Sequence, residues 1–209
     1  MFEVKDGWDF ISHLSWLDEY MMGHKGFIAG GCFKNIFNKE VTKDLDMFFE
    51  SEADFVEAEQ YYKGNEDYYI YYENSKVVAF KNRIKPHITI ELIRTVFGTP
   101  EEILSKFDFS ITKFAYFKAI EEDAGEDADG TITVYKCMYQ KDFFEHLHLK
   151  RLVVEENILF PVSTFERMLR YAKYGYFPCK ESKRRIIENL RNNVVEGDNI
   201  SQSLYNGLD

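Results

Sequence analysis

The amino-acid sequence predicts an α+β fold in which a mixed β-sheet is flanked by helices and followed by a small helical C-terminal region. Short apolar and aromatic runs bounded by turn residues, as in residues 68–82, are typical of strands and hairpins. Apolar residues at helical spacing, as in residues 7–22, predict helices that cover a sheet. From Lys136 onward the pattern becomes helical. We therefore divide the chain into a catalytic head (1–136), a helical neck-like region (137–195) and a polar tail (196–209).

The elements of the first half follow from spacing and turn chemistry. Residues 7–22 carry apolar side chains on one helical face: Trp8, Ile11, Leu14, Leu17 and Met21. The next expected elements are a strand at 27–29, a short helix after Gly31, a strand at 44–49, a helix at 52–63, and a hairpin that turns at Glu73-Asn74-Ser75. Residues 88–93 alternate, with Ile88, Ile90 and Leu92 on one face and Thr89, Glu91 and Ile93 on the other.

The second half begins with a clear helix start at Thr99-Pro100, because Thr caps a helix and Pro suits its first position. Two apolar runs on either side of the acidic loop 121–130 predict a second hairpin. Three helical stretches are expected after it: one or two helices within 138–154, a helix that Ser163 or Thr164 caps, and a helix over 180–193.

Composition limits the class of protein. The net charge of −10 argues against a general nucleic-acid binder, so a polynucleotide would need a local basic surface or a metal. Three widely separated cysteines suggest neither a disulfide framework nor a zinc site, which favours a reducing compartment. The N-terminal segment is polar, unlike a signal peptide, and no apolar run is long enough to span a bilayer. We expect a cytoplasmic protein without a membrane partner; its oligomeric state is not predicted.

Residues 26–49 contain the motif around which the function is predicted. Gly30 and Gly31 join a short strand to a helix, where backbone N–H groups suit a bound phosphate. Asp44 and Asp46 are two apart on the next strand, so both side chains point to one face. Two adjacent carboxylates repel each other unless a cation lies between them, and Mg²⁺ commonly shares such ligands with substrate phosphates. The segment therefore predicts metal-assisted chemistry on a nucleoside triphosphate.

These motifs resemble the signature of the polymerase-beta-like nucleotidyltransferases, in which Gly-Gly and a small residue precede an Asp-x-Asp strand. Within that superfamily the chain is most similar to the head of poly(A) polymerases and CCA-adding (tRNA nucleotidyltransferase) enzymes. The resemblance implies a third carboxylate on a later strand, and Glu91 between Ile90 and Leu92 matches it. An exposed acid on an edge strand is the alternative interpretation of Glu91.

Two later stretches match the same family in order. Residues 107–117 resemble its Arg-Asp-Phe-Thr-Ile-Asn-Ala stretch through Asp108, Phe109 and Ile111. Residues 164–177 resemble its Arg-rich helix through Arg167, Leu169 and Arg170, with Lys173 where Arg is usual. The alternatives are a helix-capping role for Asp108 and a solvated basic face for the helix.

The resemblance implies transfer of a nucleoside monophosphate from an NTP such as ATP to an acceptor hydroxyl, with release of pyrophosphate. It implies that Asp44, Asp46 and Glu91 are the catalytic carboxylates and hold two Mg²⁺ ions, with Mn²⁺ as an alternative. It further implies that nucleotide binding involves Gly30, Gly31, Cys32, Lys34, Asp108, Arg167, Arg170 and Lys173. Lys34-Asn35 replaces the family's usual Arg-Asp, so one bidentate donor becomes a point charge.

The acceptor is less constrained. An RNA 3′ end is the first hypothesis, and RNA binding is expected with it. We find no acid-acid-x-x-Arg element of the kind that selects the base in CCA-adding enzymes, so full CCA addition is not expected. Two alternatives remain: a non-catalytic NTP-binding or regulatory module, and a toxin-type nucleotidyltransferase that modifies a protein or small molecule.

Overall fold

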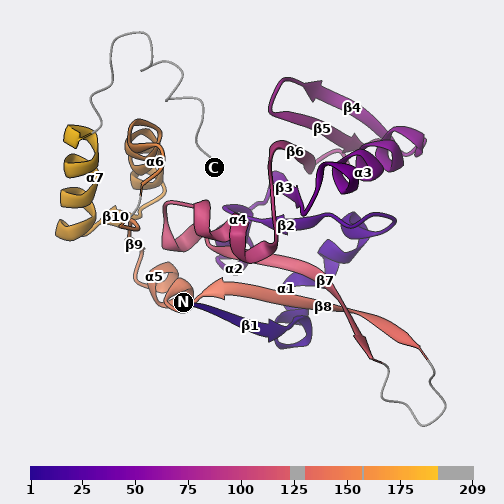
Figure 1. The fold of residues 1–209 in the computed structure, drawn as a ribbon, viewed down its shortest axis with the longest axis horizontal. Coiled ribbons are helices and arrows are strands. Elements are labelled where there is room, and N and C mark those ends of the chain that lie inside the picture. Colours follow the sequence, from indigo (N-terminus) through magenta and orange to yellow (C-terminus); the bar gives the residue numbers. More distant parts are fainter. Residues whose placement is uncertain (123–129, 157, 193–209) are drawn as a thin grey trace.

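The computed structural model describes residues 1–122, 130–156 and 158–192 (Figure 1). The tip of the predicted acidic loop (123–129) and the predicted polar tail lie outside the described residues. Within the described ranges, no helix is both long and apolar enough to cross a membrane.

Strands and helices alternate along most of the described chain. The strands are β1 (Phe2–Asp6), β2 (Phe27–Ala29), β3 (Asp44–Phe49), β4 (Tyr68–Glu73), β5 (Val77–Asn82), β6 (Thr89–Phe97), β7 (Phe114–Glu122), β8 (Thr131–Gln140), β9 (Arg151–Leu152) and β10 (Phe177–Pro178). The α-helices are α1 (Ile11–Leu14), α2 (Cys32–Phe37), α3 (Glu52–Gly64), α4 (Pro100–Lys106), α5 (Phe143–His148), α6 (Pro161–Lys173) and α7 (Lys180–Asn192). Three 3₁₀ segments complete them: η1 (Gly7–Phe10), η2 (Ser15–Met21) and η3 (Ser110–Thr112).

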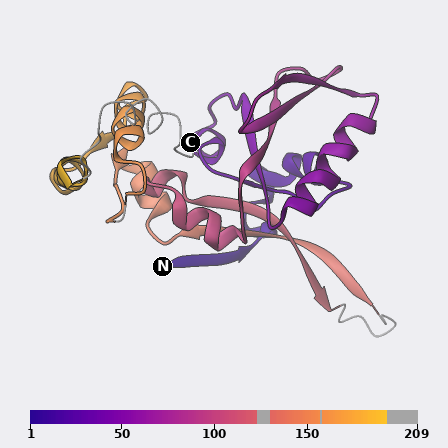
Figure 2. The same cartoon turned by 45° about the horizontal axis from the view of Figure 1, so that its top comes forward.

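An eight-stranded mixed sheet forms the body, in the order β1-β8-β7-β2-β3-β6-β5-β4. Strands β3 and β6 pair in parallel, and each other neighbouring pair in this sheet is antiparallel. This arrangement confirms the predicted α+β class, and the two predicted hairpins are β4–β5 and β7–β8. Helices α6 and α7 lie at the opposite end of the molecule from α3 and the β4–β5 hairpin (Figures 1 and 2).

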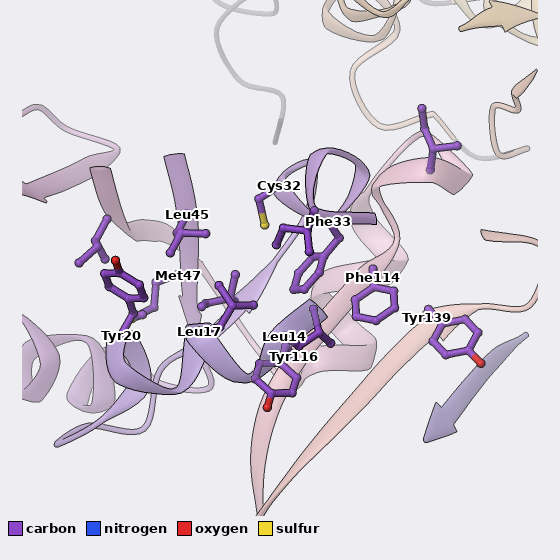
Figure 3. Close-up of a cluster of buried hydrophobic side chains, with 14 of the residues drawn as sticks. Leu14, Leu17, Tyr20, Cys32, Phe33, Leu45, Met47, Phe114, Tyr116 and Tyr139 are labelled. Carbon is purple, nitrogen blue, oxygen red and sulfur yellow. The ribbon is translucent and has the colours of Figure 1, made fainter. Parts of the chain in front are cut away.

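The two faces of the sheet bury different hydrophobic clusters. The larger cluster includes side chains from α1, η2, α2 and α3, and Phe114 is one of its central aromatic residues (Figure 3). The Phe114 ring lies 4.5 Å from that of Phe33 and 5.4 Å from that of Tyr139, measured between centroids. The smaller cluster lies where α4 packs on β2 and β7. Each sheet face is therefore covered by apolar packing over part of its area.

Side chains cap the starts of α3 and α4, and the cap predicted at Thr99 is confirmed. Thr99 and Glu102 form a reciprocal capping box at the start of α4, with Pro100 in the first turn. The side chain of Ser51 accepts from the Asp54 amide at the start of α3. These caps satisfy backbone donors that would otherwise lack a partner in the helix. The cap predicted at Ser163 or Thr164 is wrong, because α6 begins at Pro161 with Phe160 at its cap position.

Two predicted helical stretches differ from the structure. Residues 7–21 form the broken run η1–α1–η2 instead of one helix, and the Trp16 indole donates to the His13 carbonyl at 2.8 Å within it. The predicted head–neck boundary at residue 137 falls inside β8, which continues to Gln140. The cause is tertiary pairing, since β1 lies antiparallel to residues 136–140 and extends the strand.

His24 is buried between polar backbone groups that fix a neutral ring. Its Nδ1 accepts from the Gly26 amide at 3.0 Å, and its Nε2 lies 3.2 Å from the Tyr20 carbonyl. Burial, with the charge of Lys118, lowers the pKa of His24 to about 4. Protonation would place a second proton on Nδ1, which faces a backbone donor.

We expect Phe114→Ala to destabilise the fold by about 3–5 kcal/mol, because it removes a ring at the centre of the larger cluster. Urea unfolding of wild type and variant measures the difference. Phe177→Ala is the matched control, because Phe177 is 64% exposed and its loss should change stability by less than about 0.5 kcal/mol. Similar losses in both variants would contradict this account of the core.

We expect His24 to weaken the fold on acidification. The folded pKa lies below the ordinary value of 6.5, so its contribution is present above pH 6.5 and is lost as the pH falls towards 4. The full loss is about 3 kcal/mol. Urea unfolding at several pH values measures it. His24→Asn keeps an acceptor for Gly26 but does not titrate, so an equal acid loss in both proteins would refute the assignment.

Candidate active site

The two aspartates stand on β3, where alternation separates an apolar face from a polar one. Leu45 and Met47 are fully buried in the larger cluster. Phe48 points to the opposite face and packs in the smaller cluster. Asp44 and Asp46 share the face of Phe48 but lie earlier in the strand, where they line a cavity instead of a core.

Glu91 stands directly beside Asp46. The parallel register pairs Asp46 with Glu91 and Asp44 with Thr89. Register neighbours point to the same face, so the three carboxylates lie on one side of the sheet and line one cavity. Glu91 is on β6, an inner strand of the sheet, which excludes the alternative of an exposed acid on an edge strand.

Tyr72 on the edge strand β4 reaches Glu91. Its hydroxyl donates to Glu91 Oε1 at 2.6 Å. Partial burial, the hydrogen bond to Glu91 and the charges of Glu91, Asp44 and Asp46 raise the pKa of Tyr72, so the phenol stays protonated as a donor. No motif in the sequence marks Tyr72, since its register depends on an irregularity in β4.

The glycine turn is shaped by two close contacts. Gly30 has φ of 104°, a left-handed conformation that favours glycine, and its amide donates to the Phe114 carbonyl at 3.0 Å. That amide is thus committed to the sheet, contrary to the expectation that it faces a phosphate. Gly31 lines the cavity, and a Cβ there would lie 3.2 Å from the Tyr171 hydroxyl.

Cys32 and Lys34 line the same cavity at the start of α2. Burial and the charge of Asp46 raise the pKa of the Cys32 thiol well above its usual range, which disfavours a nucleophilic thiolate. Lys34 is buried and pairs with Glu40 at 2.7 Å between Nζ and Oε2. Its Nζ also lies 5.3 Å from the centre of the Tyr174 ring, so the amine is held in place by partners of this chain.

The structure separates the cations predicted for α6. Arg167 is buried in an ion pair with Asp108, which also accepts from Thr164 at 2.6 Å. Arg170 lines the cavity, whereas Lys173 is exposed and does not. The reason is geometric: three residues turn about 60° short of a full helical turn, so positions 167, 170 and 173 drift around the helix.

Asp108 and Arg167 are therefore structural in this arrangement. Neither lines the cavity, and their pairing fixes α6 to the segment between α4 and β7. The alternative of Asp108 as the cap of the following helix also fails, since the cap position of η3 is Phe109.

The cavity has a volume of about 480 Å³, within the range of small-molecule sites. Its lining contains four carboxylates (Glu40, Asp44, Asp46 and Glu91) against three cationic side chains (Lys34, Lys43 and Arg170). Tyr171 of α6 and Tyr174, which directly follows α6, also line it. Sequence analysis did not assign Lys43, Glu40 or these tyrosines; the only available signal was their proximity to the motif residues in the chain.

A family model described as Gabija anti-defense 2 family protein matches residues 9–150, more than half of the chain. The chain belongs to the Gabija anti-defense 2 family. The curated Gabija anti-defense 2 protein of Bacillus phage SPbetaL7 is 24% identical over 175 residues. That alignment covers 82% of this chain and 38% of the phage protein, so this family member spans well under half of its relative's length.

Solved structures similar to this chain include CCA-adding enzymes and a tRNA nucleotidyltransferase. The Thermotoga maritima CCA-adding enzyme complexed with tRNA has a TM-score of 0.57 at 12% identity, covering 99% of this chain and 52% of that one. A CCA-adding enzyme with CTP has a TM-score of 0.60 at 12% identity, covering 99% and 51%. These likenesses confirm the nucleotidyltransferase fold that the sequence motifs indicated.

The carboxylates fit a hard divalent cation in chemistry and placement. Carboxylate oxygens are the ligands that Mg²⁺ and Mn²⁺ prefer, and all three groups lie on one face. Across the described part of the chain, however, no three His, Cys, Asp or Glu side chains converge closely enough to hold an ion. The register of β3 and β6 nevertheless places Asp46 beside Glu91.

We expect Arg167→Ala to destabilise the protein by about 3–5 kcal/mol, because it leaves the buried Asp108 carboxylate without its cation. Urea unfolding gives the value. Arg184→Ala is the control, since Arg184 is exposed and pairs with Glu181 and Glu188 on the surface of α7, where loss costs less than about 1 kcal/mol. Equal stability of Arg167→Ala and wild type would show that the pair does not hold α6.

Proposed function

We propose that this chain transfers a nucleoside monophosphate from an NTP to an acceptor hydroxyl and releases pyrophosphate. The observation that carries the proposal is the adjacent placement of Asp46 and Glu91 on parallel strands, with Asp44 on the same face of one cavity. Clustered carboxylates repel one another unless a cation lies between them, so their presence argues against a non-catalytic module.

Asp44, Asp46 and Glu91 are the residues that would hold two Mg²⁺ or Mn²⁺ ions, which when bound would activate the acceptor hydroxyl and neutralise the phosphates. The cavity lining alone has one more carboxylate than cationic side chains, which disfavours a polyanionic triphosphate. Two divalent cations would reverse the sign of that charge.

In the proposed reaction the acceptor oxygen forms a bond to the α-phosphorus of the NTP. The bond from that phosphorus to the oxygen leading to the β-phosphate breaks, and pyrophosphate leaves with the electron pair. The acceptor proton passes to the Glu91 carboxylate or to water. Arg170 and Lys43 line the cavity, where their positive charges would attract the negatively charged phosphates.

Side chains at the end of α6 and directly after it form another wall of the cavity and would contact the nucleoside. Tyr174 is 55% exposed and lines the cavity beside Arg170. An exposed aromatic ring next to a guanidinium suits a nucleobase, which stacks on either group. Lys173 and Arg167, which lie outside the lining, are not part of this proposal.

Family membership bears on the acceptor. The phage relative is named for acting against Gabija, and we propose that nucleotidyl transfer by this chain serves the same purpose, with a component of that defence as the acceptor. This corresponds to the alternative of a nucleotidyltransferase that modifies a protein. An RNA 3′ end remains the competing acceptor, supported by the likeness in fold to enzymes solved with tRNA.

Incubation with labelled NTPs and Mg²⁺ tests both acceptors. One reaction contains purified Gabija proteins and the other contains mixed RNA. We expect label in one acceptor and a loss of at least about 100-fold in Asp46→Asn, since a metal ligand is worth several kcal/mol in the transition state. Asp9→Asn, an exposed acid away from the cavity, should match wild type. Absence of both labelled product and pyrophosphate with either acceptor would refute the proposal.

A further inference from the structure

A continuous row of register neighbours crosses four strands and ends at the candidate active site. Tyr72 of β4 pairs with Ala79 of β5, Ala79 pairs with Glu91 of β6, and Glu91 pairs with Asp46 of β3. Side chains of register neighbours share a face. Tyr72 therefore stands on the carboxylate face of the sheet, two strands away from Glu91.

An irregularity in the edge strand creates this register. Ile70 pairs with Phe80 but Tyr72 pairs with Ala79, so Tyr71 is an extra residue between them. In a regular ladder Tyr71 would oppose Ala79, and Tyr72 would point to the other face. The bulge instead delivers Tyr72 to the carboxylate face.

The ring contacts agree with the bulge. The Tyr71 and Tyr72 rings lie 5.7 Å apart between centroids, and Lys81 Nζ lies 3.8 Å from the centre of the Tyr71 ring. Tyr71 thus has a cationic partner on β5, whereas the Tyr72 hydroxyl donates to Glu91. Two adjacent tyrosines on one strand have different partners.

The residue between Tyr72 and Glu91 is the smallest that carries a Cβ. Ala79 is fully buried, and its methyl group leaves room for the phenol to pass across β5. The backbones of β4 and β6 are two strand spacings apart, about 10 Å, and the side chains of Tyr72 and Glu91 together span this distance. The hydroxyl then meets Glu91 Oε1 at 2.6 Å.

We propose that Tyr72 is a positioning residue that holds the Glu91 carboxylate in the orientation needed to bind a divalent cation together with Asp46. This inference rests on the proposed function and adds a residue that no motif contains. A neutral hydroxyl that donates to one carboxylate oxygen orients the group without cancelling its charge, as outer-shell partners of metal ligands do.

Mn²⁺ titration followed by electron paramagnetic resonance, with a non-hydrolysable NTP analogue present, tests the proposal without needing turnover. We expect Tyr72→Phe to bind Mn²⁺ about 10–100-fold more weakly than wild type. Tyr71→Phe is the matched control, because it removes a neighbouring hydroxyl that does not hold Glu91, and its affinity should equal that of wild type. Thermal unfolding should be the same for both variants, since both tyrosines are substantially exposed.

A double-mutant cycle separates positioning from a general effect on the sheet. On a Glu91→Gln background, Tyr72→Phe should cause no further loss of Mn²⁺ affinity, because its effect passes through the carboxylate. Where transfer is measured, Tyr72→Phe should lower kcat more than it raises KM for the acceptor.

The outcomes distinguish the positioning role of Tyr72 from the proposed function. Wild type that binds Mn²⁺, with Tyr72→Phe binding equally well, would overturn the positioning role and leave the proposed function standing. Additive losses in the cycle would also overturn it. Wild type that binds no Mn²⁺ with the analogue would overturn the proposed function and the role of Tyr72 with it.

Discussion

The parallel pairing of β3 with β6 is the constraint on which the site depends. Parallel strands need a long crossover between them, and here α3 and the β4–β5 hairpin supply it. The pairing places Asp46 beside Glu91, an arrangement that like charges oppose. Leu45 and Met47 on one strand and Ile90 and Leu92 on the other are fully buried beneath these carboxylates. Burial of those side chains stabilises the strand pair against the repulsion above it.

Positive charge around the cavity has two different roles. Arg167 is used inside the fold, where its pairing with Asp108 docks α6. That docking presents Arg170 and Tyr171 to the cavity about one turn further along the helix, and Tyr174 just after the helix ends. A buried ion pair thus places an exposed arginine, and the two neighbouring cations of one helix are not interchangeable.

The sequence predicted the fold well because its signals were local or periodic. Alternation along residues 88–93 placed Glu91 opposite Ile90 and Leu92, and the structure has the same two faces. The capping box at Thr99 and the two hairpins were likewise readable from short segments. The narrower family was not predicted, since membership rests on similarity over most of the chain and not on the short motifs.

What the sequence could not predict depends on contacts between distant segments. Helical spacing alone grouped Arg167 with Arg170, whereas burial beside Asp108 separates them. The bulge that brings Tyr72 to Glu91 has no signature in a run of aromatic residues. Strand β1 was missed because pairing with β8, and not its own composition, makes it a strand.

The Gly30 amide, tied to the Phe114 carbonyl, joins the loop beside the cavity to the most crowded aromatic ring of the interior. A change of ring size at position 114 that moves its backbone also moves the loop. The packing of the interior and the shape of the loop beside the cavity are therefore mechanically linked through one backbone hydrogen bond.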